Sequence, residues 1–331
     1  MTLTDTAPDR ATGTGRAHGK VVLIGEHTVV YGMPAIAIPM SGLSAHATLH
    51  PPEAGSPPPA PSAHWLGHDD ALEVRFTCSA DTIPAGSGVA AATAAALRCW
   101  DPRGRPWEVR IRSDIPPARG LGSSAAAAAA SVRAVADLCG AALDERSLYR
   151  LVQTGEKVTH GRPSGVDAAA VTATGPIRFA AGIARPIPTR VDARLVVADT
   201  GESGSTRQAV DSVRARLQHD HANARRLLTK AAELTEGAAA DLADGDASGL
   251  GVRLTEFQRL LRELGISTTE LDRLIAAALK AGACGAKLTG SGLGGCVLAL
   301  VEPHRAATVR EALTAAGAHR TWTVPMTQET S

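Results

Sequence analysis

Hydrophobic and polar positions divide the chain into a strand-rich first half and a helix-rich second half. Apolar and polar residues alternate over 41–50 and 107–115, and a short apolar run fills 18–25, which predicts strands at all three places. Later segments are predicted as strands for their short apolar or alternating runs: 165–173, 175–180, 193–200, 294–302 and 320–325.

Apolar residues at spacings of three and four, with charges between them, predict helices in the second half. Helices are also predicted at 122–139 and 145–159. Ser267 stands three residues before Glu270, the spacing of a capping box, so we expect Ser267 to cap the helix that follows it. The second-half helices are expected at 204–218, 222–243, 249–264, 269–281 and 304–317.

Proline-rich stretches mark the connections. The segment 51–70 predicts a variable surface loop, and two prolines with a loss of periodicity in 182–192 predict a domain boundary. We therefore expect two α+β domains, residues 1–185 and 186–331.

Composition excludes several classes of protein. The net charge of +1 is too small to attract nucleic acid electrostatically, so a nucleic-acid partner is not expected. Five scattered cysteines, mostly in apolar runs, favour reduced, buried thiols over a disulfide framework or a zinc site. Signal-peptide and membrane-length apolar runs are missing from the sequence, so the expectation is a cytoplasmic protein with no membrane partner.

The stretch PPARGLGSSAAAAAA, residues 116–130, places a glycine-serine loop directly before an alanine helix. Helix N-termini carry unpaired N–H groups and partial positive charge, so an anion binds there if glycines let the backbone approach. Ser123 and Ser124 offer caps or hydroxyl ligands. The alternative is an ordinary capped helix after a proline turn. A second glycine stretch, 290–295, matches G-x-G-x-x-G, but a predicted strand follows it, so a dinucleotide site is rejected.

Three separated motifs together resemble the GHMP kinase superfamily of small-molecule kinases. They are GKVVLIGEHTVVYG at 19–32, PPARGLGSSAA at 116–126 and KLTGSGLGGCVLAL at 287–300. A fourth segment, EKVTHGRPSGVDAAAV at 156–171, is most similar to the mevalonate kinases of that superfamily. The chain departs from the pattern where glycine or a small residue is usual, at Ala118, Arg119 and Leu293.

The resemblance implies a two-domain α+β GHMP kinase fold, with a mixed β/α N-terminal domain that binds ATP and a helix-rich, ferredoxin-like C-terminal domain. It implies ATP and Mg²⁺ as cofactors and mevalonate as the small-molecule substrate, phosphorylated at its primary hydroxyl in isoprenoid synthesis. A homodimer is an expectation that the sequence does not decide.

The resemblance also implies roles for residues. Asp167 would accept the hydroxyl proton, and Lys20 would either touch the phosphate or only orient Asp167. Ser124 and Glu156 match the metal positions. The nucleotide loop would consist of Pro117, Ala118, Arg119, Gly120, Leu121, Gly122, Ser123, Ser124 and Ala125. The substrate would meet Lys20, Glu26, His27, Asp167, Arg178, Thr289, Gly290 and Ser291.

Three questions stay open at this level. His27 and Arg178 are both candidates for the substrate carboxylate, and Arg119 would either reach nucleotide phosphate or be solvated. Glu156 and His160, four apart on a predicted helix, give only a weak zinc pattern because a third ligand is missing at motif spacing. The rival functions are a kinase for galactose or homoserine, the related decarboxylase, and a non-catalytic ligand sensor.

Overall fold

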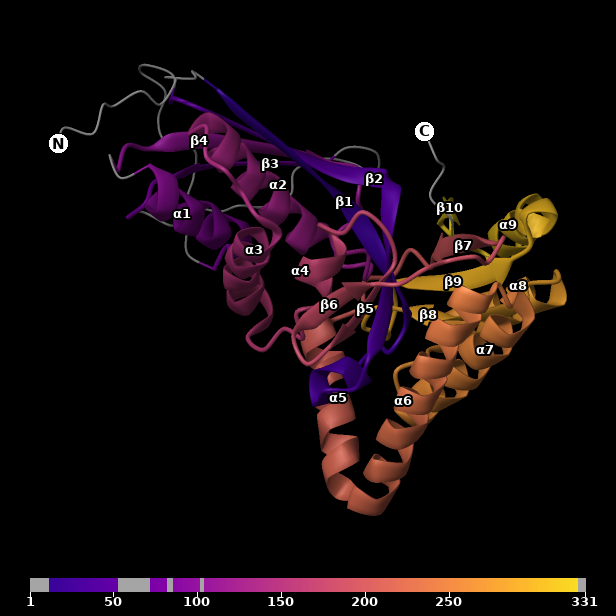
Figure 1. Cartoon of the computed structure of the whole chain (residues 1–331). Helices are drawn as coiled ribbons and strands as arrows, with labels where there is room; N and C mark the ends of the chain where they lie inside the picture. Colours follow the sequence, from indigo (N-terminus) through magenta and orange to yellow (C-terminus); the bar gives the residue numbers. More distant parts are fainter. Residues whose placement is uncertain (1–11, 53–71, 82–85, 102–103, 327–331) are drawn as a thin grey trace. The chain divides into compact units, whose positions relative to one another are not determined.

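The computed structural model describes residues 12–52, 72–81, 86–101 and 104–326 (Figure 1). The predicted loop at 51–70 lies almost entirely outside these residues. Contacts group the chain into two compact units. The first comprises Met1–Gly19, Ser41–Pro116 and Gly122–Thr172, and the second comprises Lys20–Met40, Pro117–Leu121 and Ala173–Ser331.

This division differs from the single boundary expected at residue 185. The reason lies in two long strands, β1 (Gly13–Ile24) and β2 (Ala35–His50), which pair with each other and each contribute residues to both units. Strands of 12 and 16 residues exceed what one small sheet needs. The sequence pattern predicted only the apolar end of β1, at 18–25, and the alternating end of β2, at 41–50.

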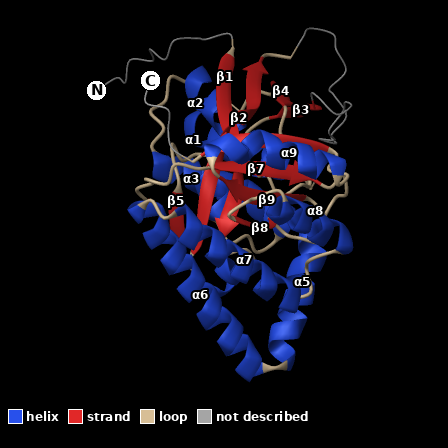
Figure 2. Cartoon of the chain, turned by 90° about the vertical axis from the view of Figure 1, so that its right-hand side faces the viewer, coloured by secondary structure: helices blue, strands red, loops and turns tan. Residues whose placement is uncertain are grey.

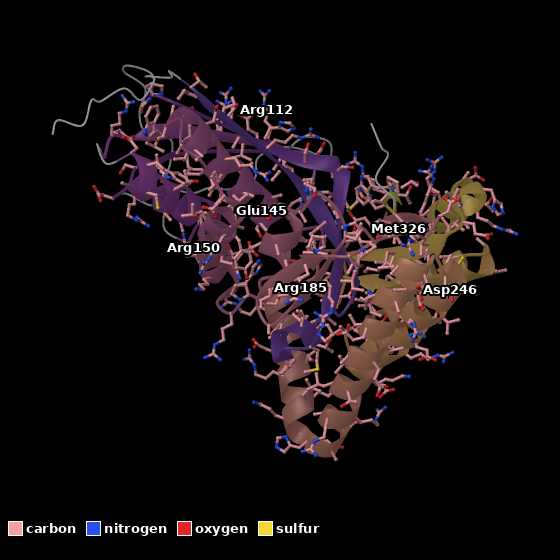
Figure 3. The ribbon with its side chains drawn as sticks, viewed as in Figure 1. Arg112, Glu145, Arg150, Arg185, Asp246 and Met326 are labelled. Atoms are coloured by element: carbon pink, nitrogen blue, oxygen red, sulfur yellow. The ribbon has the colours of Figure 1, made fainter. Side chains whose placement is uncertain are left out.

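The first unit carries an antiparallel sheet in which β4 (Trp107–Ser113) lies between β3 (Leu72–Cys78) and the second half of β2. The alternation predicted for this segment is confirmed. Val109 and Ile111 are buried, whereas Arg110 and Arg112 lie on the opposite face, where Figure 3 labels Arg112. One face of the sheet therefore packs into the core and the other meets solvent.

Helices α1 (Gly88–Trp100), α2 (Ser123–Leu138) and α3 (Glu145–His160) pack on one another. Helix α1 also contacts strand β3, and helix α2 contacts strand β4. The alanine run of α2 is wholly buried. A Cβ at Gly15 of β1 would stand 2.1 Å from the Ala130 carbonyl oxygen. The absence of a side chain at Gly15 thus lets β1 lie directly against the backbone of α2.

Two predictions for the first unit are wrong or incomplete. The segment 165–173, predicted as a strand, contains the short helix α4 (Val166–Ala170) after a left-handed Gly165 with φ 96°. Helix α1 was not predicted, because its alanine-rich sequence has no periodic polar face.

The second unit holds a four-stranded antiparallel sheet in the order β10-β7-β9-β8. Helices α7 and α8 contact β8, α8 also contacts β9, and α9 contacts β7 and β10 (Figure 2). With four helices between the first two strands and α9 between the last two, this is a ferredoxin-like arrangement, as expected. Its strands are β7 (Arg194–Asp199), β8 (Gly285–Thr289), β9 (Cys296–Val301) and β10 (Arg320–Pro325). Its helices are α5 (Thr206–His219), α6 (His221–Asp244), α7 (Ala247–Glu263), α8 (Thr269–Lys280) and α9 (Ala306–Ala315).

A short sheet edge completes this unit. β5 (Ile177–Ala180) pairs with the first residues of β2 and with β6 (Ile183–Pro186). Two short 3₁₀ turns, η1 (Thr28–Tyr31) and η2 (Pro303–Arg305), also lie in it, and α6 contacts η1.

The predicted capping box at Ser267 is wrong by one residue. Thr268 is the N-cap of α8, and its side chain accepts a hydrogen bond from the Leu271 amide. The Ser267 hydroxyl instead donates to Asp272, 2.6 Å away, and accepts from Gln258. Both residues are hydroxyl-bearing, so the local sequence could not distinguish which one would adopt the extended cap conformation.

The burial that was expected for the cysteines holds for only two of them. The five cysteines all lie in described residues and form no disulfide; Cys78 and Cys296 are buried, whereas Cys99 is exposed. Among helices of the described ranges, none combines the length and apolarity that a membrane span requires. The cytoplasmic location stays a prediction.

Candidate active site

The glycine-serine loop contributes residues to both units. Pro117–Leu121 belong to the second unit and Gly122 onward to the first. Gly120 and Gly122 are left-handed, with φ 78° and 77°, a conformation that favours glycine. A Cβ on Gly120 would stand only 2.9 Å from the Cα of Gly290. The second and third motifs therefore meet backbone to backbone inside the second unit.

Lys20 holds this loop from β1. Its amide donates to the Leu121 carbonyl and its Nζ donates to the Gly120 carbonyl, each at 2.9 Å. The side chain is buried. The predicted position on the first strand is confirmed, and the structure adds that the ammonium lies at the loop expected to hold phosphate.

Arg119 is largely buried and uses two of its three guanidinium nitrogens within the protein, while its buried Nη1 has no hydrogen-bond partner among the described residues. Its Nε donates to the buried Asp199 carboxylate at 3.0 Å, and Nη2 donates to the Gly201 carbonyl at 2.7 Å. Beside it, the Gly295 carbonyl accepts from the Thr200 hydroxyl at 2.9 Å. The arginine thus fastens the segment 117–121 to the end of β7, where Thr200 in turn contacts the third motif.

Helix α2 begins without a side-chain cap, because its N-cap is Gly122. The expected capping by Ser123 or Ser124 is therefore wrong. The Ser124 hydroxyl instead donates to Glu156 on α3 at 2.8 Å. Glu156 is buried, and its other oxygen lies 3.7 Å from His160 Nε2. The first amides of α2 thus receive no hydrogen bond from a capping side chain. The Ser124 hydroxyl and the Glu156 carboxylate meet beside them within the first unit.

Close packing sets the position of Glu156. Its neighbour Gly155 faces Gly88 of α1, and a Cβ on Gly155 would lie 2.4 Å from the Gly88 carbonyl oxygen. Only glycines allow the two helices to approach this closely. The approach of α1 to α3 therefore determines where the carboxylate stands.

Asp167 lies in the first turn of α4 and is half-buried. The Pro-Ser-Gly turn before it is fixed by a hydrogen bond from the Val166 amide to the Ser164 hydroxyl at 3.3 Å. A carboxylate in the first turn of a helix is favoured by the exposed amides there. The motif thus presents Asp167 from a short, rigid element of the first unit.

Glu26 and His27 form a buried turn after β1. His27 has φ 60°, a strained value for a residue with a side chain, and its Nε2 lies 2.8 Å from the Ser291 carbonyl. Burial lowers the pKa of His27, and the Ser291 carbonyl opposes that shift. Burial raises the pKa of Glu26, against the opposing effect of Lys287.

Lys287 is a site residue that sequence reasoning missed. It begins the third motif, and its ammonium donates to Glu26 and to the Leu288 carbonyl, the latter at 2.6 Å. In this arrangement the Glu26 carboxylate is turned into the protein and is not presented to a substrate. A lysine inside an otherwise apolar strand was the available signal, because such a residue needs a buried partner.

Thr289 connects the third motif to β1 within the second unit. Its hydroxyl donates to the Val22 carbonyl at 3.0 Å and accepts from the Val22 amide at 3.1 Å. Gly290 meets Gly120, and the Ser291 carbonyl meets His27. The predicted loop residues thus lie together at the end of β1.

Arg178 lies on β5 and forms a two-point pair with Glu236 of α6. Its Nε lies 3.2 and 3.1 Å from the two carboxylate oxygens, and Nη2 also donates to Glu236. This hydrogen bonding raises the pKa of Arg178. Glu236 engages the Nε–Nη2 edge of the guanidinium, so the Nη1 edge is directed elsewhere.

The predicted residues thus fall into two groups. Ser124, Glu156 and Asp167 belong to the first unit, whereas Lys20, His27, Arg178 and the third motif belong to the second. Searched over the described residues, the chain shows no group of three or more His, Cys, Asp or Glu that would hold a metal by itself.

Comparison with known proteins matches two family models, the GHMP kinases N terminal domain at residues 87–175 and the GHMP kinases C terminal domain at residues 238–319. The chain is 34% identical over 300 residues to a mevalonate kinase of Aeropyrum pernix, covering 88% of this chain and 90% of that protein. It is 33% identical to a mevalonate kinase of Thermococcus gammatolerans, with 91% and 92% covered. Among solved structures, L. major mevalonate kinase in complex with R-mevalonate has a TM-score of 0.77 at 26% identity, over 97% of this chain and 99% of that one.

Proposed function

The chain belongs to the GHMP kinases, and we propose that it transfers the terminal phosphoryl group of ATP to the primary hydroxyl of mevalonate, giving 5-phosphomevalonate and ADP. One observation supports mevalonate as the substrate: the similarity to a mevalonate kinase extends over 88% of this chain and 90% of that protein. In chemical terms the chain would serve the mevalonate pathway of isoprenoid synthesis.

The nucleotide phosphates would bind at the start of α2. The left-handed glycines Gly120 and Gly122 leave the backbone open to close approach, and the unpaired amides of the helix favour an anion. Lys20 supports this loop through the Gly120 carbonyl. The loop would hold the phosphates mainly through backbone groups, with Arg119 fixing its shape from behind.

Mg²⁺ would bind at Ser124 and Glu156. Their oxygens lie 2.8 Å apart, close enough to be neighbouring ligands of one small ion, and both are the hard donors that Mg²⁺ prefers. When bound, the ion would neutralise charge on the transferring phosphoryl group. Glu156 supplies the negative charge and Ser124 the neutral oxygen.

Asp167 would accept the proton from the mevalonate hydroxyl. Phosphoryl transfer requires alignment and charge neutralisation more than covalent chemistry, and a fixed carboxylate provides the base. Lys20 would then stabilise negative charge that develops on the oxygens.

The carboxylate of mevalonate would bind to Arg178 or His27. A guanidinium has two edges, and Glu236 engages one of them, so Arg178 can hold a second carboxylate by its Nη1 edge. The burial of His27 lowers its pKa, so it would meet the substrate as a neutral hydrogen-bonding group. This contrast favours Arg178 for charge recognition.

A coupled assay of ADP release tests the proposal directly, with mevalonate, phosphomevalonate, galactose and homoserine as acceptors. We expect the highest kcat/KM for mevalonate. Faster turnover of galactose or homoserine would leave only the family assignment. No ADP release with any acceptor, in a protein that binds mevalonate, would favour the ligand sensor.

A further inference from the structure

Lys287 and Glu26 form an ion pair in the interior of the second unit. The Lys287 side chain is 0% exposed and that of Glu26 is 1% exposed. The Phe257 ring centroid lies 5.8 Å from the ammonium. The second oxygen of Glu26 is buried and has no hydrogen-bond partner among the described residues. Two charges are therefore removed from water with incomplete compensation.

Such a pair is a poor way to gain stability, because desolvation cancels most of the attraction and apolar residues of similar volume do as well or better. Its geometry indicates another use. Glu26 directly precedes His27, whose φ of 60° does not persist unless neighbouring contacts hold it. The pair fixes the residue before the strained one.

Two further links tie the same two segments together. Two residues beyond Lys287, the Thr289 hydroxyl bonds both backbone groups of Val22 in β1. Two residues further on, the Ser291 carbonyl meets His27 Nε2 at 2.8 Å. Lys287, Thr289 and Ser291 thus clamp the first motif at three successive points, and Lys287 is the only charged member of the three.

We propose that Lys287 is a positioning residue for phosphoryl transfer. Its ammonium anchors the Glu26 carboxylate, which sets the turn that presents the His27 ring to the substrate. This inference rests on the proposed function, because it assumes that His27 lies at the mevalonate site. It assigns Glu26 an indirect role in place of substrate contact.

The test compares Glu26→Gln with the double variant Glu26→Gln/Lys287→Met. The double variant leaves neither buried charge without its partner, whereas Glu26→Gln leaves the buried Lys287 ammonium without its anion and Lys287→Met alone would leave the carboxylate without its cation. A thermal unfolding curve of Glu26→Gln therefore checks that it is folded before its kinetics are compared. The Glu26→Gln side chain keeps an acceptor for the ammonium, and the double variant loses that bond. A 1 Å displacement near the reacting groups costs up to ~10²-fold.

We expect the double variant to show a mevalonate KM at least ~10-fold above that of Glu26→Gln, with the ATP KM changed less than ~3-fold. Leu313→Ala, a cavity variant in α9, controls for general loosening. It should lower Tm and leave the mevalonate KM unchanged. Equal mevalonate KM values for Glu26→Gln and the double variant would overturn the proposal.

A second readout does not depend on the substrate assignment. The ring signals of His27, assigned in NMR spectra by their loss in His27→Gln, report the position of the imidazole directly. We expect them to shift between Glu26→Gln and the double variant and to stay in place in Leu313→Ala. If the wild type does not phosphorylate mevalonate, the proposed function fails, and unchanged His27 signals would separately refute the positioning role.

Discussion

Two strained residues, Ala118 and Leu293, lie at positions where the sequence departs from the motif pattern of the family it resembles. Ala118 in the nucleotide loop and Leu293 in the third motif both have φ 55°. A side chain in this left-handed region costs roughly 1–2 kcal/mol. At Ala118 and Leu293 the backbone therefore has a conformation that favours glycine, although each residue carries a side chain.

Ala118→Gly should stabilise the protein. Relief of the left-handed strain exceeds the entropy that glycine loses on folding, so we expect the free energy of unfolding to rise by about 0.5–1 kcal/mol. Ala118 is exposed, so no packing is lost. Denaturant unfolding measures the change. Ala240→Gly, at an exposed position within α6, is the matched control and should lose about 1 kcal/mol. Equal losses at both positions would show that Ala118 is not strained.

The Glu26–Lys287 pair predicts a dependence of stability on pH. Burial raises the pKa of Glu26, and Lys287 and Lys20 oppose that rise. In Lys287→Met the Glu26 pKa rises further, so the folded state binds a proton that the unfolded state releases above pH ~4.5. The stability lost through Lys287→Met should therefore increase as pH rises from about 5 to 8.

Unfolding in urea at the two pH values measures this. The double variant Glu26→Gln/Lys287→Met lacks the carboxylate, so its loss of stability should change less between the two pH values than the loss in Lys287→Met. A pH-independent loss in Lys287→Met itself would mean that Glu26 does not carry the charge assigned to it.

At the scale of elements, the spacing of apolar residues predicted the helices that have one polar and one apolar face. The five amphipathic helices of the second half were predicted close to their observed bounds, because each has a polar face. Helix α1 was missed because its alanines give it no polar face. Helix α4 was mistaken for a strand because five residues are too few to show a helical repeat of apolar positions. The Pro-Ser-Gly turn, not the apolar pattern, positions Asp167.

The site was predicted through motifs, and its supporting contacts were not. Ser124 and Glu156 meet because α2 and α3 pack on each other, and the close approach of Gly88 to Gly155 holds α1 against α3 beside Glu156. Sequence spacing cannot reveal a contact between residues 32 positions apart on two helices. The same limit concealed Lys287, whose partner is 261 positions away.

The meeting of α2 and α3 predicts a metal dependence. Glu156→Gln keeps the size of the side chain and removes the charge, so the Mg²⁺ concentration for half-maximal rate should rise roughly tenfold or more. Ser124→Ala should give a smaller rise, because it removes a neutral ligand.

Glu145→Gln is the matched control for this titration. Glu145 begins the same helix, is exposed, and is labelled in Figure 3. Its loss removes an equal charge from α3 and should leave the Mg²⁺ titration unchanged. If Glu145→Gln and Glu156→Gln shift the titration equally, the effect is one of general charge and Glu156 is not a ligand.

At the scale of the whole molecule, the residues expected to act on the substrate are divided between the two units. Asp167 belongs to one, and Lys20 and Arg178 to the other. Asp167→Asn should lower kcat by ~10²–10⁴-fold, because the amide cannot accept the hydroxyl proton. The ATP KM should change little, since the nucleotide loop is untouched. A variant with more than about a tenth of wild-type turnover would remove Asp167 from the role of base.

The last prediction concerns how a small acid is told apart from a neutral sugar. Arg178 keeps one guanidinium edge on Glu236, which orients the other edge for a carboxylate. Hydrogen bonds to a charged group contribute ~1.5–3 kcal/mol, so Arg178→Met should raise the mevalonate KM about 10–100-fold. The ATP KM should stay within about threefold. Glu236 is half exposed, so the loss of its partner should cost little stability.

Arg185 provides the matched control. It lies directly opposite Arg178 in the pairing of β5 with β6, is exposed, and is labelled in Figure 3. Arg185→Met removes the same charge from the same sheet edge without touching the Glu236 pair, and it should leave the mevalonate KM near that of the wild type. Equal increases in the two variants would indicate a general electrostatic attraction of the acid. If Arg178→Met matches the wild type while His27→Ala loses mevalonate binding, His27 and backbone groups hold the carboxylate instead.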